Sequence, residues 1–159
     1  MSRELRIRSG GQTGADRAAL DAAIASGVEI GGFVPRGRWA EDGPIAAEYP
    51  GLIEIASGDP AQRTRLNVEH SDGTVIFSHG KLSGGSALTA RFARDLKKPY
   101  LHIDLLACSQ EAAIEKLRLW IKARDVSELN VAGPRASSDP FIYGPVRTII
   151  ERLLTDGGI

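Results

Sequence analysis

The chain has 159 residues, of which 42% are hydrophobic and 25% are charged, the composition of an ordinary folded protein. Its length predicts a single domain over residues 1–159, large enough to bury a core. Lys plus Arg and Asp plus Glu both total 20, so the chain lacks the basic excess that would indicate a nucleic-acid partner. It also lacks the long apolar segment that would indicate a signal peptide or a membrane span.

Short apolar runs typical of strands alternate with patterns typical of helices along the whole chain. Strands are expected over residues 5–8, 29–34, 52–55 (a short edge strand), 74–78, 100–104 and 129–132. Helices are expected over residues 15–26, 62–71, 86–97, 109–123 and 140–154. This alternation predicts an α/β fold, a single doubly wound and mostly parallel sheet with helices on both faces, as in Rossmann-like domains.

The most informative segment is the glycine-rich loop SGGQTGAD, which joins the first predicted strand to the first helix. Gly10, Gly11 and Gly14 allow a sharp turn and a close approach to a ligand, and the N-terminus of the next helix favours an anion. With Thr13 they are predicted to form a phosphate cradle. Asp16 is expected to complete a capping box with Thr13, or to accept a hydrogen bond from a ligand. The loop has neither the G-x-G-x-x-G fingerprint nor a Walker lysine, which disfavours NAD chemistry and a P-loop.

Three further loops each follow a predicted strand, and ligands bind parallel sheets at the carboxyl ends of their strands. The ligand-binding residues predicted in these loops and just beyond them are Arg36, Gly84, Gly85, Ser86, Thr89, Gly133, Arg135 and Ser137. The LSGGS loop would form a second anion cradle, and Arg36 and Arg135 would supply positive charge. Trp39 is a candidate to stack on a flat heterocycle.

Two carboxylates are the candidates if the protein is an enzyme, namely Asp16 and Glu41. The segment from Glu41 onward, EDGP, is equally typical of a surface turn. His79 is interpreted as an exposed loop histidine and Cys108 as a packing residue. A single cysteine with three scattered histidines predicts no metal held by protein side chains, no disulfide and a reducing, cytoplasmic location.

Several separate motifs together resemble one known family. They are SGGQTGADRAALDAA, GGFVPRGRWAEDGPI, RTRLNVEHSDGTVIF, LSGGSALTARFA and LNVAGPRAS. This chain resembles the putative molybdenum-carrier family from about residue 5 to residue 154; that family belongs to the Rossmann-like superfamily of the LOG (lysine-decarboxylase-like) and DNA-processing protein A proteins. The resemblance implies a homo-oligomer that binds molybdenum cofactor, a pterin dithiolene with a terminal phosphate, and passes it to a molybdoenzyme. Because the dithiolene holds the metal, the protein itself needs no metal ligands.

The LOG relatives are hydrolases that split nucleoside monophosphates, and their motif has the form G-G-x-G-T-x-x-E. Aligned from Gly84, this chain has Ala87 and Leu88 at the later glycine and threonine positions and Arg91 at the glutamate position. Replacing the catalytic carboxylate by a guanidinium argues against the hydrolase.

The hypothesis that follows is a binding or carrier protein for a small phosphorylated heterocycle, with molybdenum cofactor as the ligand implied by the resemblance. Two alternatives remain. One is a hydrolase acting on a nucleoside monophosphate or an ADP-ribose-like nucleotide. The other is a nucleotide sensor.

Overall fold

The computed structural model describes residues 4–156, so the predicted domain limits of 1–159 extend beyond the described residues at both ends. Six strands form one sheet in the order β5-β2-β1-β8-β6-β7, and all five strand pairings in it are parallel. These strands are β1 (Arg6–Arg8), β2 (Ile30–Val34), β5 (Leu52–Glu54), β6 (Gly73–Ser78), β7 (Tyr100–Asp104) and β8 (Glu128–Ala132). The predicted parallel α/β fold is confirmed, and β5 is an edge strand as expected.

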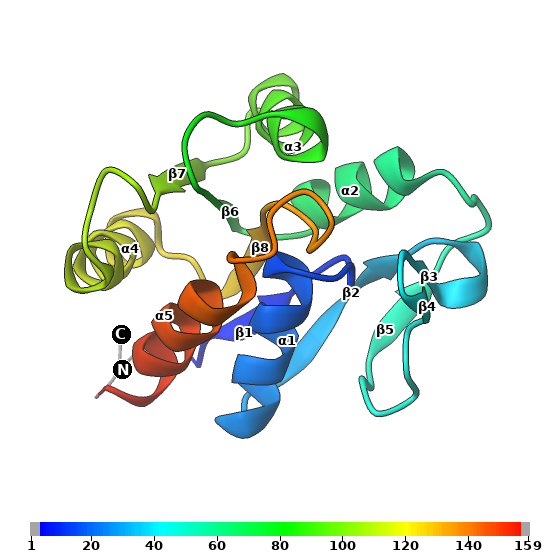
Figure 1. The fold of residues 1–159 in the computed structure, drawn as a ribbon, viewed down its shortest axis with the longest axis horizontal. Helices are drawn as coiled ribbons and strands as arrows, with labels where there is room; N and C mark the ends of the chain where they lie inside the picture. The colour runs from blue at the N-terminus through cyan, green and yellow to red at the C-terminus, as the bar shows by residue number, and fades with distance from the viewer. Residues whose placement is uncertain (1–3, 157–159) are drawn as a thin grey trace.

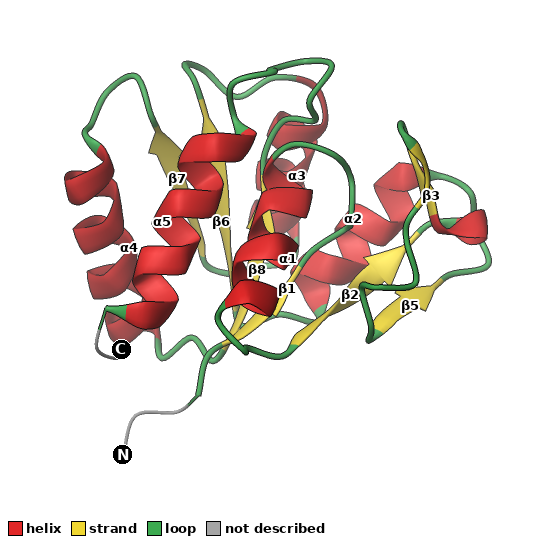
Figure 2. Cartoon of the chain, turned by 60° about the horizontal axis from the view of Figure 1, so that its bottom comes forward, coloured by secondary structure: helices red, strands yellow, loops and turns green. Residues whose placement is uncertain are grey.

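Five helices cover the two faces of this sheet (Figures 1 and 2). They are α1 (Ala15–Ala25), α2 (Pro60–Glu69), α3 (Gly84–Asp95), α4 (Gln110–Arg124) and α5 (Tyr143–Thr155). Helix α5 packs against both α1 and α4 on one face, whereas α2 and α3 pack together on the other. No helix in residues 4–156 has the length and apolar character needed to cross a membrane.

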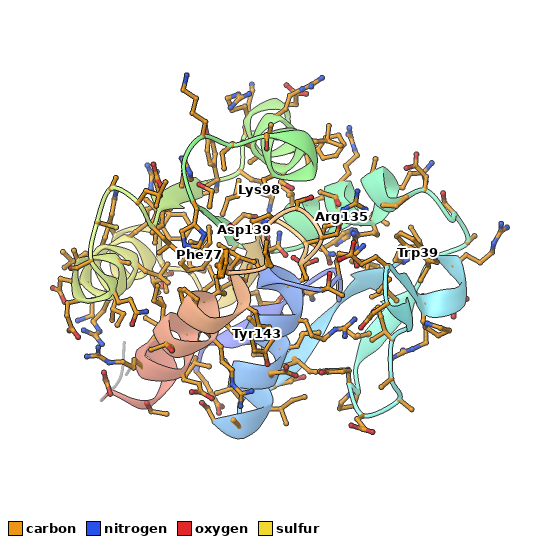
Figure 3. The ribbon with its side chains drawn as sticks, viewed as in Figure 1. Trp39, Phe77, Lys98, Arg135, Asp139 and Tyr143 are labelled. Carbon is orange, nitrogen blue, oxygen red and sulfur yellow. The ribbon has the colours of Figure 1, made fainter. Side chains whose placement is uncertain are left out.

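The double covering explains the composition of the central strands. Every residue of β6, with the sequence GTVIFS, is buried, as a strand covered on both faces requires. Helix α1 buries a face of small residues that includes Ala18, Ala19, Ala22 and Ala23, which lets α5 approach closely. Phe77 lies in the core between these layers (Figure 3).

The segment from residue 35 to residue 50 is folded onto the carboxyl edge of the sheet. It contains a 3₁₀ turn, η1 (Arg36–Arg38), and an antiparallel hairpin of β3 (Trp39–Ala40) and β4 (Gly43–Pro44). The Arg38 guanidinium donates to the carbonyls of Ile45 and Ala46. The Tyr49 hydroxyl donates to Asp21 of α1 at 2.6 Å. These bonds fasten the segment to itself and to α1.

The expected capping box of α1 is wrong. The N-cap is Gly14, which makes no side-chain capping bond, and the Thr13 hydroxyl donates to Glu41 at 2.5 Å instead. The Thr13 hydroxyl therefore bonds to the β3–β4 hairpin, a tertiary contact, instead of capping the helix.

The strand order determines which loops meet. Strand β8 lies between β1 and β6, so the loops after these three strands are neighbours at the carboxyl edge. The chain moves from β1 to β2 in one direction and from β6 to β7 in the other, which is a topological switch point. Such points are where open α/β sheets bind ligands.

Candidate ligand-binding site

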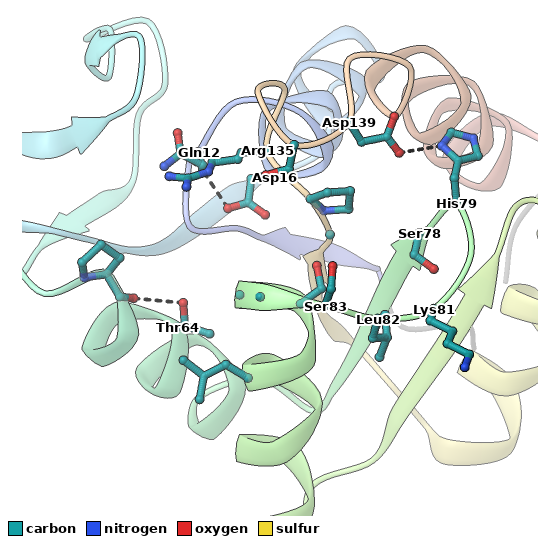
Figure 4. A pocket seen from close by; sticks show the side chains of 18 of the residues that line it. Gln12, Asp16, Thr64, Ser78, His79, Lys81, Leu82, Ser83, Arg135 and Asp139 are labelled. Atoms are coloured by element: carbon teal, nitrogen blue, oxygen red, sulfur yellow. Dashed lines mark hydrogen bonds and ion pairs between the residues drawn. The ribbon is translucent and has the colours of Figure 1, made fainter.

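A cavity of about 830 Å³ opens at this switch point, within the size range of small-molecule sites (Figure 4). Its walls are the loops after β1, β6 and β8, together with the first turns of α2 and α3. Five kinds of group face it: an open helix N-terminus, cations, a buried charged pair, a histidine–aspartate pair and exposed apolar side chains.

The helix N-terminus is that of α3, and its first amides have no acceptor. The amides of Ser86 and Ala87 donate to the Ser83 carbonyl, but those of Gly84 and Gly85 donate to no group within the described chain. Apart from its chain neighbours and the nearby backbone of α3 itself, no atom lies within 4 Å of the position that a Cβ would take at Gly84 or Gly85. The Ser86 side chain lines the cavity at 6% exposure, and its hydroxyl makes no hydrogen bond to the residues described. Free amides, the helix dipole and a hydroxyl together suit a phosphate oxygen.

Two positive side chains line the same cavity as this terminus. Lys81 and Arg135 both line the cavity, from the loops after β6 and β8. Arg135 Nε lies 3.7 Å from a carboxylate oxygen of Glu41, and about half of the Arg135 side chain is exposed. Arg135 thus has guanidinium surface left for an anionic ligand.

A buried carboxylate and a buried guanidinium line another part of the cavity. Asp16 Oδ2 accepts a hydrogen bond from the Gln12 amide at 3.3 Å. Arg63 Nη1 donates to the Gly10 carbonyl at 2.5 Å, and Arg63 Nε donates to the Thr64 hydroxyl at 3.1 Å. Burial raises the pKa of Asp16 to about 6, against the attraction of the Arg63 charge. Burial also lowers the pKa of Arg63.

Gly10 makes room for this pair. A Cβ at position 10 would lie 2.6 Å from Arg63 Nη1 and 3.0 Å from Asp16 Oδ2. The two charged groups nevertheless form no ion pair with each other, so each keeps bonding capacity. We call these two neighbouring residues the Asp16–Arg63 pair.

A histidine and an aspartate form a second pair at the cavity. His79 Nδ1 lies 2.6 Å from Asp139 Oδ2, and Figure 4 shows the two side chains facing each other at the cavity wall. Asp104 accepts bonds from the amides of Gly80 and Leu106, which holds the loop that carries His79. The Asp139 carboxylate therefore orients the His79 imidazole. The other ring nitrogen, His79 Nε2, makes no hydrogen bond to any described residue.

The apolar part of the wall comes from separate loops. Trp39 is 44% exposed and Phe141 is 77% exposed, and both line the cavity with Leu82 and Leu106. Figure 3 places Arg135 between Asp139 and Trp39. Exposed aromatic rings beside cations suit a flat anionic heterocycle.

The structure brings together some of the predicted site residues and places others elsewhere. Those that line the cavity are Asp16, Gly84, Gly85, Ser86, Gly133 and Arg135. Those that do not line it are Gly10, Gly11, Thr13, Gly14, Arg36, Thr89 and Ser137. Arg36 belongs to the η1 turn. The Thr89 hydroxyl donates to the Gly85 carbonyl and so supports the α3 terminus from within.

Glu41 was a catalytic candidate from the sequence. In the structure its side chain joins two loops. Its carboxylate accepts bonds from the hydroxyls of Thr13 and Ser137, both at 2.5 Å, and from the Ser137 amide at 3.0 Å. These hydrogen bonds lower the pKa of Glu41. The side chain of Gln12 adds to the junction, because its Oε1 accepts from the amides of Thr13 and Glu41.

Sequence reasoning missed Arg63, Lys81 and the pairing of His79 with Asp139. Arg63 lies on a helix rich in polar residues, where an arginine is normally solvated, and only the packing of α2 beside the first loop buries it. His79 and Asp139 are 60 residues apart. No local pattern signals a contact of that separation.

Comparison with known proteins agrees with the observed fold. The chain matches the Circularly permutated YpsA SLOG family over residues 7–154. A solved structure of a putative molybdenum carrier protein from Syntrophus aciditrophicus SB is 49% identical, covers 97% of both chains and superposes with a TM-score of 0.94. A structure of (E)-4-hydroxy-3-methyl-but-2-enyl diphosphate reductase is 17% identical, covers 83% of this chain and 47% of its own, and has a TM-score of 0.41. A search of curated proteins gave no match.

The likeness to the reductase is too weak to support an argument. The family match and the 49% identical structure confirm the resemblance that the sequence motifs suggested. The chain belongs to the Circularly permutated YpsA SLOG family.

Proposed function

We propose that this protein binds and carries a small phosphorylated heterocycle. The observation that supports the proposal best is the pair of free amides at Gly84 and Gly85, which open into a cavity also lined by Lys81 and Arg135. The name of the 49% identical relative, a putative molybdenum carrier protein, suggests molybdenum cofactor as the cargo.

The residues present suit that cargo. The terminal phosphate of the cofactor would bind the α3 terminus and the Ser86 hydroxyl, and Lys81 and Arg135 would bind its remaining anionic oxygens. Trp39 and Phe141 would contact the ring system. The cofactor holds its metal through its own sulfur atoms. Within residues 4–156, no three His, Cys, Asp or Glu side chains gather to hold a metal ion.

A hydrolase is the second candidate function, and one contact favours it. The His79–Asp139 pair resembles the oriented imidazole of a general base, and Asp16 is a buried carboxylate that lines the cavity. Glu41 is a poorer catalytic candidate, because its oxygens already accept bonds from Thr13 and Ser137. The nucleotide sensor, the homo-oligomer, the molybdoenzyme recipient and the cytoplasmic location stay predictions.

The decisive experiment changes the charge at the α3 terminus without disturbing the fold. Gly85 is surrounded by open space and does not have a positive φ, so it can accept a side chain. In Gly85→Asp, a carboxylate would stabilise the helix N-terminus but repel a bound phosphate. Gly85→Asn is the matched neutral control.

The binding of isolated molybdenum cofactor, AMP and GMP, and of the matching nucleosides, is measured by calorimetry. We expect the phosphorylated ligands to bind at least about tenfold more tightly than the nucleosides. Gly85→Asp should lose at least about tenfold in affinity for them, whereas Gly85→Asn should stay within about threefold. Equal binding of nucleotide and nucleoside, or no effect of Gly85→Asp, would overturn the proposal. Release of base or ribose phosphate that Asp16→Asn abolishes would establish the hydrolase instead.

A further inference from the structure

We infer that the Asp16–Arg63 pair recognises the 2-amino-4-oxopyrimidine edge that pterins and guanine share. The inference rests on the proposed function and deepens it, because it names the class of heterocycle rather than the phosphate. It depends on bonding capacity that the fold has buried at the cavity and left unused.

Asp16 offers acceptor capacity to a ligand. The residue is 9% exposed, and its carboxylate accepts one hydrogen bond, from the Gln12 amide to Oδ2. A carboxylate has about four acceptor positions. Oδ1 accepts no bond from the described residues, so it is available to a donor that enters the cavity.

Arg63 offers donor capacity beside it. The residue is 7% exposed, and its Nη1 and Nε donate to Gly10 and Thr64. Nη2 donates to no described residue. Since every fully buried side-chain nitrogen and oxygen in the described residues has a partner, Nη2 is not fully buried and is accessible to an acceptor. The two bonds hold the guanidinium in place, so its free nitrogen is fixed in direction.

The two groups are close enough to bind one ring. Nη1 of Arg63 and Oδ2 of Asp16 both border the position of a Cβ on Gly10. The main cavity gives access to both residues. A separate space of about 30 Å³, lined in part by Asn67, Thr89 and Asn130, also touches them but is too small for a ring.

The chemistry of the pair selects the ligand edge. A 2-amino-4-oxopyrimidine presents two neighbouring N–H donors, the ring N–H and the exocyclic amine, which a carboxylate accepts together. The carbonyl oxygen beside them accepts from a guanidinium. Adenine presents a ring nitrogen acceptor where the carboxylate needs a donor. A buried charged group left unpaired in this way is costly, which gives strong discrimination.

The experiment replaces one carboxylate oxygen of Asp16 by an NH2 group, through the variant Asp16→Asn. Binding of GMP, IMP, XMP, AMP and 6-hydroxymethylpterin phosphate is measured by calorimetry for the natural protein and for Asp16→Asn. Xanthine carries an oxygen where guanine carries the amine, so it needs a donor there, which asparagine supplies and aspartate does not. The control is Asp42→Asn, which removes a carboxylate that pairs with Arg17 and does not line the cavity.

We expect the natural protein to prefer GMP or the pterin phosphate over AMP and XMP by about tenfold or more. Asp16→Asn should reverse the order of GMP and XMP, and Asp42→Asn should not. Guanine and pterin both carry this ring edge. Whichever of GMP and the pterin phosphate binds more tightly identifies the physiological class of ring.

Two results would overturn the inference and leave the proposed function standing. The first is equal binding of all the phosphates, and the second is an unchanged order of GMP and XMP in Asp16→Asn. If none of the phosphorylated ligands bound, both the inference and the proposed function would be overturned. A reversal cannot come from unfolding alone, because a damaged cavity loses affinity for every ligand.

Discussion

The protein contains two glycine-rich loops that look alike in sequence but differ in construction. In the first loop, the amides of Gly11 and Thr13 donate to the side chains of Ser9 and Gln12, and Gly14 packs directly against the carbonyl of Pro134. In the second loop, the amides of Gly84 and Gly85 have no acceptor among the described residues, and the space beside both glycines is open. The first loop is a junction between parts of the fold, and the second offers its amides to a ligand.

The difference teaches that glycine content alone does not identify an anion cradle. A glycine serves either close packing of the backbone or exposure of its amide, and the neighbouring acceptors decide which. Ser9, Gln12, Asp16 and Glu41 supply such acceptors around the first loop. The described residues supply none for the amides of Gly84 and Gly85.

The largest expected effect is on the glycine of the junction. Gly14 has a φ of 77° and a ψ of −128°, and a Cβ there would lie 2.3 Å from the Pro134 carbonyl oxygen. Gly14→Ala should therefore lower the free energy of unfolding by about 4 kcal/mol, from backbone strain and overpacking together. Gly85→Ala, in the second loop, should leave it unchanged or raise it by about 0.5–1 kcal/mol, because alanine favours a helix. Urea unfolding of both variants is the measurement, and equal losses would abolish the distinction between the loops.

The next effect is a pH dependence that comes from Asp16, at the end of the first loop. Burial raises the pKa of Asp16 from 3.8 to about 6, so the folded protein keeps this proton at pH values where the unfolded chain has lost it. The contribution of Asp16 to stability is thus present at low pH and is lost as the pH rises through about 6, by about 3 kcal/mol. Asp16→Asn cannot titrate. Its unfolding free energy relative to the natural protein should rise between pH 4 and pH 7, and a constant difference would show that the carboxyl is not buried as described.

The smallest effect concerns Glu41, which connects the first loop to the loop after β8. Hydrogen bonds from Ser137 and Thr13 lower the pKa of Glu41, so its contribution is present at neutral pH and is lost as the pH falls. Glu41→Gln should lower the free energy of unfolding at pH 7 by about 1–2 kcal/mol, and by less at acidic pH. The opposite pH trends of Asp16→Asn and Glu41→Gln, measured by urea unfolding, would separate the cavity carboxylate from the junction carboxylate. A loss for Glu41→Gln that is the same at acidic and neutral pH would contradict this role.

Most of the fold could be predicted from the chain because its signals are local. The continuous apolar run of β6 indicated a strand covered on both faces, and the expected strand over residues 100–104 coincides with β7. The site was harder to predict. Gly84, Gly85 and Arg135 were proposed from their loops and line the cavity, but Arg63 lies on a helix with nothing in its local pattern to indicate burial.

The sequence by itself determined the parallel α/β class, the family and the presence of glycine loops at strand ends, because each follows from residues close together in the chain. Only the tertiary structure decided which amides remain free, which carboxylate is buried at the cavity and which one joins loops. Those outcomes depend on partners that are distant in sequence, such as Glu41 with Ser137 and His79 with Asp139. Hydrogen bonding and desolvation act through space, so their effect on a side chain appears only when the packed neighbours are known.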